Sequence, residues 1–218
     1  MYNELRSVED SYKILKNSKF DISSLGALFV KSGVHEYLGI CLLHKHYDIL
    51  PGETVVQKGL ITSPDTVDIK DLFPIIMKVN KDSLEYLEFT HDKGANKYIP
   101  IEFYKELNRI LSDNGLDDVL GITVINGKDK YYLEHTEDRN NILERISKEQ
   151  AHELGSNIPT NWFFNNQPTD ACVSSTRCET TISCSVVCRS TPNRGHSSST
   201  HAQSNTGHRS ITMPHQKA

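Results

Sequence analysis

The 218-residue sequence has no run of 18 apolar residues, and its first 166 residues contain a single cysteine, Cys41. The first absence argues against a transmembrane helix, which needs about 20 such residues. Residues 1–6 are polar and lack the apolar segment of a secretory signal peptide. Together these absences predict a cytoplasmic or nuclear protein whose thiols are reduced.

The sequence also lacks the motifs that name common enzyme classes. It has no P-loop, no Gly-x-Gly-x-x-Gly fingerprint and no Gly-x-Ser-x-Gly nucleophile elbow. Its basic residues are scattered and are not interleaved with aromatic residues, so nucleic acid is not an expected partner. Cys41 and His44 would point to opposite faces of a strand, which argues against a Cys–His nucleophile pair.

The composition changes abruptly after Asn166. Of the 48 residues from Ala171 onward, 17 are Ser or Thr, and aromatic residues are absent. This stretch has five Lys or Arg and one acid, a charge of +4, while the rest carries −8 of the overall −4. Such a composition cannot offset the entropy of ordering, so we expect a globular domain over 1–166 and a disordered tail over 167–218. An altered reading frame is an alternative explanation for the tail.

The pattern of apolar residues predicts an α+β fold, with helices packed on a mostly antiparallel sheet. Helices are expected to begin near Ser7, at Ser23 or Ser24, at Pro100 and at Thr136, the last of them reaching Leu154. Strands are expected over 36–49, 53–57, 75–79, 84–91, 119–125 and 130–136. Hairpin turns are expected at 51–52 and 126–127. The apolar segment 162–164 should pack against this body.

The most informative segment is the expected strand 36–49. Both of its faces are apolar in the first half, as in a strand covered on both sides, and it then becomes polar at His44 and His46. Residues two apart on a strand point to the same face, so the two imidazoles should lie together. This arrangement suits a metal ion, a proton shuttle or an anion.

Two other expected strands also end in histidine, at His91 and at His135. If these strand ends meet, a cluster of three or four histidines would form near three carboxylates, which are Asp48, Glu88 and Glu134. Imidazoles with a carboxylate suit zinc, iron, copper or manganese, and they also suit acid–base chemistry near neutral pH. The alternative is that they are ordinary polar residues at strand ends, where solvent begins.

The tail contains a second candidate metal site. Its four candidate ligands, spaced like parts of a zinc finger, are Cys184, Cys188, His196 and His201. The segment lacks the twelve-residue spacer and the apolar residues of a folded finger. A disordered tail that binds a protein partner is the other interpretation of this region.

Two resemblances bear on the histidine segment. Gly39, His44, His46, Glu53 and Gly59 resemble the first motif of the cupins, but the variable gaps differ and the second cupin motif is absent. Residues 34–53 resemble a group of uncharacterised fungal proteins that have a Leu-Leu-His-Lys/Arg-His-Phe strand. That group implies no activity, but it draws attention to the histidine pair.

Two hypotheses therefore remain open. The first is a small intracellular metal-binding protein, with or without enzyme activity, that binds zinc or iron through His44 and His46 with His91 or His135. The second is a non-catalytic interaction or regulatory protein in which the histidines are structural and the tail binds a partner or zinc.

Overall fold

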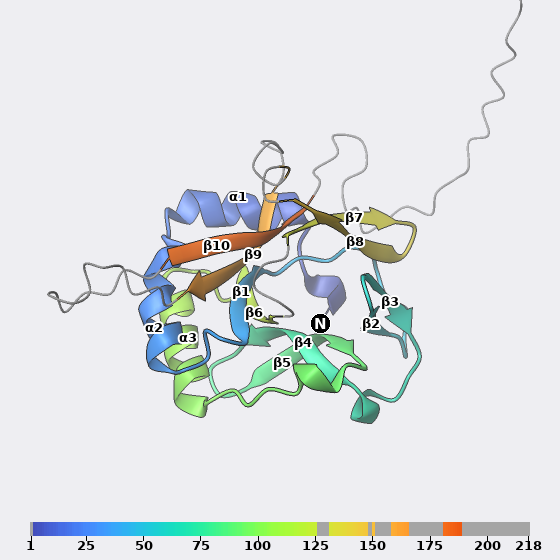
Figure 1. Ribbon diagram of the computed structural model, residues 1–218, viewed down its shortest axis with the longest axis horizontal. Coiled ribbons are helices and arrows are strands. Elements are labelled where there is room, and N and C mark those ends of the chain that lie inside the picture. Colours follow the sequence, from blue (N-terminus) through green and yellow to red (C-terminus); the bar gives the residue numbers. More distant parts are fainter. Residues whose placement is uncertain (1, 126–130, 148–149, 151–157, 166–180, 189–218) are drawn as a thin grey trace, which may run out of the picture.

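The computed structural model describes residues 2–125, 131–147, 150, 158–165 and 181–188, which form a closed β-barrel with helices on one side (Figure 1). The barrel has ten strands, which are β1 (Leu38–Leu42), β2 (Thr54–Lys58), β3 (Ile61–Asp65), β4 (Phe73–Val79), β5 (Leu84–Thr90), β6 (Leu120–Val124), β7 (Tyr131–Glu137), β8 (Asn140–Ile146), β9 (Ile158–Asn165) and β10 (Thr181–Cys188). Their order around the barrel is β1-β6-β4-β5-β2-β3-β8-β7-β10-β9, and β9 pairs with β1 to close it.

The sheet is mixed, which corrects the expected mostly antiparallel sheet while leaving the α+β class in place. Two pairings join strands distant in sequence in parallel, β2 with β5 and β10 with β7. Hairpin signals reveal only antiparallel neighbours, because parallel strands need a long crossover connection. Strand order of this kind cannot be read from local patterns.

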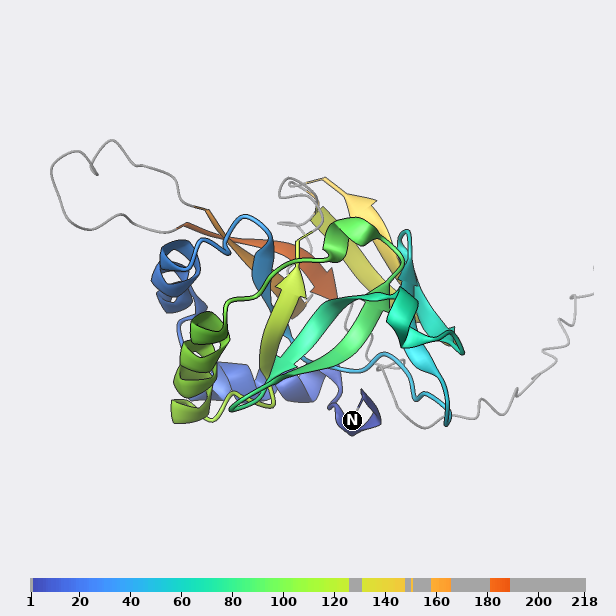
Figure 2. The ribbon, with the colours of Figure 1, turned by 90° about the horizontal axis from the view of Figure 1, so that it is seen from below.

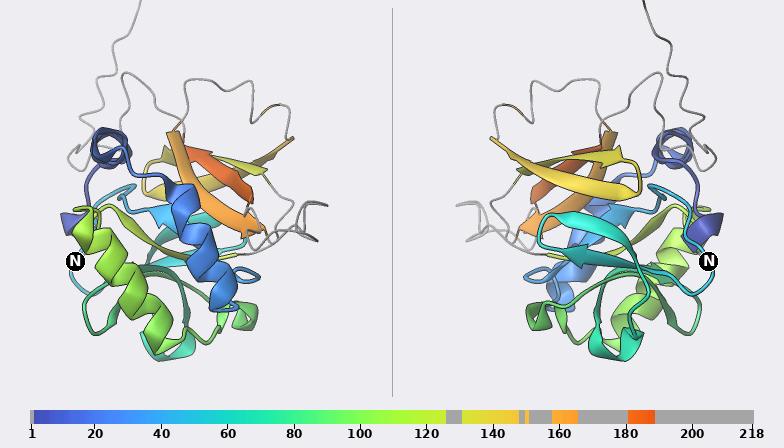
Figure 3. Two further views of the ribbon diagram at one scale, coloured as in Figure 1. Left: turned by 90° about the vertical axis from the view of Figure 1, so that its left-hand side faces the viewer. Right: turned by 90° about the vertical axis from the view of Figure 1, so that its right-hand side faces the viewer.

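Three α-helices cover one side of the barrel, as the left panel of Figure 3 shows. They are α1 (Val8–Ser18), α2 (Gly26–Lys31) and α3 (Ile101–Asp113). The Ser7 hydroxyl accepts a hydrogen bond from the Asp10 N–H and caps α1, as predicted. No helix in the described part of the chain is long and apolar enough to cross a membrane.

The main hydrophobic core lies between these helices and the outer face of the barrel. Phe29 of α2 packs edge-on against Phe103 of α3, with ring centroids 4.9 Å apart, and also contacts Phe164 of β9. Leu38 and Ile40 of β1 are fully buried in the same core. The burial of Phe164 agrees with the expectation that 162–164 packs against the body.

Two glycines allow the strands to approach closely inside the barrel. A Cβ on Gly121 would lie 2.5 Å from the Met77 carbonyl oxygen and 2.6 Å from Leu43 Cδ2. A Cβ on Gly39 would lie 2.5 Å from the Trp162 carbonyl oxygen. Real side-chain atoms cannot occupy such positions unless backbone strands separate.

Replacing Gly121 by alanine should therefore destabilise the protein by about 1–3 kcal/mol through overpacking. Chemical denaturation of the variant measures the loss. Gly94→Ala is a suitable control, because its Cβ would meet only the flexible Asp92 carboxylate, at 3.1 Å. Equal stability of the two variants would contradict the close approach of β4 and β6.

Several predicted elements differ in the structure. The helix expected over 136–154 is wrong over 140–146, because these residues form β8, which pairs with β7 through a tight turn at Asp138. Asp138 adopts a positive φ of 53°, which aspartate tolerates in hairpin turns. The hairpin expected at 51–52 is not formed as a strand pair, since β2 pairs with β3 and β5. The turn expected at 126–127 lies outside the described residues, and the described parts of its flanking strands pair elsewhere, β6 with β1 and β4 and β7 with β8 and β10.

Part of the expected disordered tail contributes to the barrel. Residues Thr181–Cys188 form β10, which pairs with β9 and β7 and completes the ring of strands. The remainder of the tail, 167–180 and 189–218, lies outside the described residues. The division of the chain at residue 166 stays a prediction.

Candidate metal centre

His44 and His46 lie in an extended segment that follows β1, because β1 ends at Leu42 rather than at the expected residue 49. The N-terminal residues hold this segment in place from one side. The Lys45 N–H donates to the Arg6 carbonyl, and the His46 N–H donates to the Tyr2 hydroxyl at 3.3 Å. Both imidazoles are buried, with 8% and 5% of their residue surfaces exposed.

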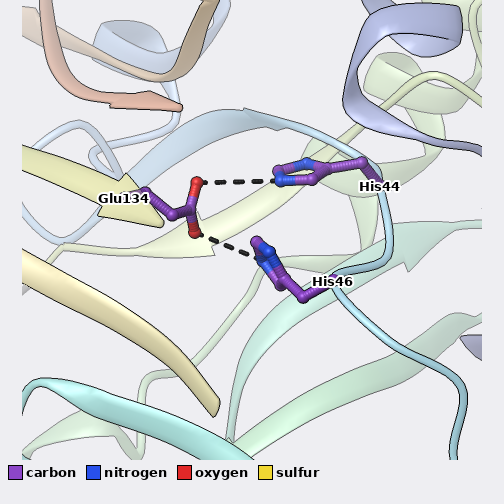
Figure 4. Close-up of side chains that lie close together, drawn as sticks. All are labelled: His44, His46 and Glu134. Carbon is purple, nitrogen blue, oxygen red and sulfur yellow. Dashed lines mark ion pairs between the residues drawn. The ribbon is translucent and has the colours of Figure 1, made fainter. Parts of the chain in front are cut away.

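The histidine rings point toward Glu134, which comes from β7 (Figure 4). Its Oε2 lies 3.7 Å from His44 Nε2, and its Oε1 lies 3.3 Å from His46 Nε2. Two neighbours orient this carboxylate: Asn141 Nδ2 donates to Oε1 at 2.8 Å, and the Thr160 hydroxyl donates to Oε2 at 3.4 Å. One carboxylate thus bridges two buried imidazoles and is itself fixed by β8 and β9.

The His44 ring is held in a defined orientation by its own backbone. Its Nδ1 lies 2.8 Å from the Leu42 carbonyl oxygen, and because that oxygen can only accept, Nδ1 carries a proton. The other ring nitrogen, Nε2, is therefore the one directed at Glu134. A carbonyl that fixes the far nitrogen in this way is typical of metal-binding histidines.

Burial and ion pairing shift the pKa values of these three side chains in opposite directions. Burial alone would lower the pKa of His44, but the adjacent Glu134 carboxylate outweighs it and raises the pKa. For His46 burial prevails over Glu134 and lowers the pKa. Burial would raise the pKa of Glu134, yet His46 and His44 hold it well below its usual value. Glu134 is therefore an ionised carboxylate at neutral pH.

Glu88 of β5 is a second buried carboxyl group beside this cluster. Burial, aided by the charge of Glu134, raises the pKa of Glu88 to about 7, against the opposing effect of His44. A small void of about 40 Å³ is lined by Glu88 together with His44, His46 and Glu134. The four side chains thus surround one small internal space.

The three closest side chains can hold a metal ion. One ligand atom from each of His44, His46 and Glu134 lies within 4.8 Å of the other two. Ligands around a single zinc ion are about 3.3 Å apart, a spacing that follows from bond lengths near 2.0–2.1 Å. Side-chain adjustments of about an ångström would therefore bring all three donors onto one ion, and the lining of the void already has the required chemistry.

The other expected ligands do not join this group. His135 follows Glu134 directly on β7, so it faces the opposite side of the strand, where its Nε2 lies 3.7 Å from Glu137. His91 is exposed just after β5. Glu53, the glutamate of the cupin-like spacing, pairs with Arg139 instead. His44 and His46 lie together as predicted, but neither His91 nor His135 joins them, and Glu134 is the third member of the group.

The candidate ligands of the tail site lie where the structure describes no side chains. Cys184 and Cys188 lie in β10, whose side chains are not described, and His196 and His201 lie outside the described residues. Among the described residues, Cys41 is a buried free thiol, and burial raises its pKa. A buried thiol with a raised pKa is a poor nucleophile at neutral pH.

Fold and site together define a closed, mixed β-barrel that encloses a buried group of two histidines and one glutamate. Comparison with protein-family models, with curated proteins and with solved structures finds no match to the chain.

Proposed function

We propose that the protein is a small metal-binding protein in which His44, His46 and Glu134 bind a divalent transition-metal ion, and that it is an enzyme. The convergence of three buried ligands from distant parts of the chain carries the proposal. Structural zinc sites are usually closed by four protein ligands, whereas catalytic sites use three and leave a position open. Three ligands beside an internal cavity are therefore typical of a catalytic site.

Zinc and iron(II) are the two ions that suit this donor set. Two imidazoles and a carboxylate form catalytic zinc sites, and the same set forms the facial triad of non-haem iron enzymes. Glu88 stands at the edge of the same void and would serve as a further ligand or as an acid–base group. The barrel would exclude bulk water from the ion.

A second candidate function is that of a non-catalytic protein with structural histidines. One observation favours it: Glu134 already pairs with both histidines and receives hydrogen bonds from Asn141 and Thr160. A buried network with these partners can support the barrel without a metal. On this interpretation the tail would bind a protein partner or zinc.

Metal analysis of the purified full-length protein separates the two functions. We expect about one zinc or iron per chain in the wild type, and a loss of at least 100-fold in affinity when His44 and His46 are both replaced by alanine, since two of three ligands disappear. His35→Ala/His91→Ala is the matched control, because neither residue belongs to the group.

The tail is tested in the same assay by Cys184→Ser/Cys188→Ser, which keeps the chain of β10 in place. Metal lost only in this variant would move the site to the tail. Absence of stoichiometric metal from the wild type after incubation with either ion would refute the proposed function.

A further inference from the structure

A cavity of about 320 Å³ lies inside the barrel next to the metal-binding group. It shares four lining residues with the small void among the histidines, namely Ile76, Glu88, Glu134 and Asn161. Ligand pockets start at about this volume, so the space is sufficient for a single-ring molecule. The four shared residues place the proposed metal site at the inner end of this cavity.

The strand register places the outer end of the cavity at the opposite end of the barrel from the histidines. Leu42, next to the histidine segment, pairs with Leu120 at the start of β6, whereas the cavity is lined by Thr123 and Val124 at the end of β6. Leu60, another lining residue, is 44% exposed. The cavity thus extends from the buried cluster toward solvent near the β2–β3 turn.

The inner wall offers two hydrogen-bonding groups, and the described residues leave an acceptor of one of them, Asn141, unsatisfied. Asn141 is 3% exposed, and its Nδ2 donates to Glu134, which fixes the orientation of the amide. Its Oδ1 then has no hydrogen-bond partner among the described residues, although a buried amide oxygen normally has one. Glu88 lines the same wall, and its carboxyl group accepts hydrogen bonds in either protonation state.

The charges of the wall disfavour ionic ligands. No Lys, Arg or His is found among the described residues that line the cavity, so the described part of the wall offers no cation to an organic anion. Glu134 is already paired with both histidines and would be paired with the metal ion when one is bound, so it offers no unbalanced charge to an organic cation. Glu88 is the other carboxyl group of the described wall, and burial with the charge of Glu134 raises its pKa to about 7, so it is mostly uncharged in mildly acidic solution. The remaining wall is largely apolar and includes Phe163, Ile76 and Leu143.

We propose that this cavity binds an uncharged small organic molecule that presents hydrogen-bond donors to Asn141 and Glu88 and an apolar part to Phe163. The inference deepens the proposed function, because it names the substrate class for the space beside the metal. The groups that would contact the molecule belong to the cavity walls and not to the metal ion, so the cavity can bind it even if the metal proposal fails.

Three probes of similar shape and different charge test this inference: benzyl alcohol, benzoate and benzylamine. Ligand-observed NMR on the metal-free full-length protein at pH 6, where Glu88 is mostly protonated and no ion is present to coordinate benzoate, gives their relative affinities. We expect benzyl alcohol to bind at least about tenfold more tightly than either ion, since a desolvated charge without a partner is costly. Strongest binding of benzoate or benzylamine, or no binding of any probe, would overturn the inference.

Two variants of β8 locate the binding. Leu143→Trp fills the cavity and should abolish the benzyl alcohol signal, whereas Ile146→Trp, outside the lining, should keep it. Circular dichroism confirms that both fold. An unchanged signal in Leu143→Trp would refute binding in the cavity. Because benzyl alcohol binding is measured on the wild-type protein with metal removed by a chelator, failure of the metal proposal and failure of this inference are distinguishable.

Discussion

Replacing Glu134 by glutamine is expected to lower the free energy of unfolding of the metal-free protein by about 3–5 kcal/mol at pH 7. The substitution keeps the size of the side chain but removes the charge that faces two buried imidazoles at 3.3 and 3.7 Å. Removing one partner of a buried charged group leaves the other uncompensated in a poorly solvated place. The loss should therefore exceed that of an ordinary surface substitution.

The difference between wild type and variant should depend on pH. Because the pKa of Glu134 is held well below its usual value of 4.5, its contribution is present above pH 4.5 and disappears as the pH falls through the folded-state pKa. Urea denaturation between pH 3 and pH 8 measures this. We expect a large difference at neutral pH and a shrinking one in acid.

Glu137→Gln is the matched control, since Glu137 lies on the same strand with an exposed carboxylate. Its stability should stay within about 0.5 kcal/mol of the wild type. Glu134→Gln should also weaken metal binding, because one of three ligands becomes a neutral amide. A variant with wild-type stability and wild-type metal content would contradict both the pairing and the proposed ligand role.

The sequence predicts elements well where the signal is local. Ser7 begins α1, and Pro100 precedes α3, whose apolar stripe of Phe103, Leu107 and Leu111 is buried as its spacing indicates. Prediction from the sequence fails where tertiary contacts decide the secondary structure. The segment 140–146 contains apolar residues at helical spacing, yet the turn at Asp138 and pairing with β7 make it a strand. Closure of the barrel depends on β10, which lies within the Ser/Thr-rich segment from Ala171 onward, whose overall composition favours disorder.

Only the part of the site that depends on local geometry could be predicted from the sequence. His44 and His46 are two residues apart, so local geometry brings them together, and the structure confirms their proximity, with ring centroids 4.6 Å apart. Glu134 is 88 residues further along the chain than His46, and only the strand order brings it to them. Glu134 and His135 are adjacent on β7, so only one of them can point into the barrel. Which one does so depends on the register of β7 with its neighbours, and the sequence does not reveal that register.

Replacing Glu88 by glutamine should instead stabilise the metal-free protein at pH 8, by about 3 kcal/mol. Burial, with the charge of Glu134, raises the pKa of Glu88 from 4.5 to about 7. The folded state thus binds this proton more tightly than the unfolded state, so wild-type stability falls as the pH rises from 4.5 to 7. Glutamine has no proton to lose, so the variant avoids this decline. At pH 4 the two proteins should be equally stable.

Denaturation in the presence of a chelator, at intervals from pH 4 to pH 8, measures this difference, with Glu102→Gln on the exposed face of α3 as the control. A difference that does not change with pH, or a variant that is less stable at pH 8, would contradict the buried state of Glu88. Adding zinc or iron(II) should reduce the advantage of the variant, because a bound cation favours the ionised carboxylate. The same titration therefore tests whether the ion binds beside Glu88, where the two internal spaces meet.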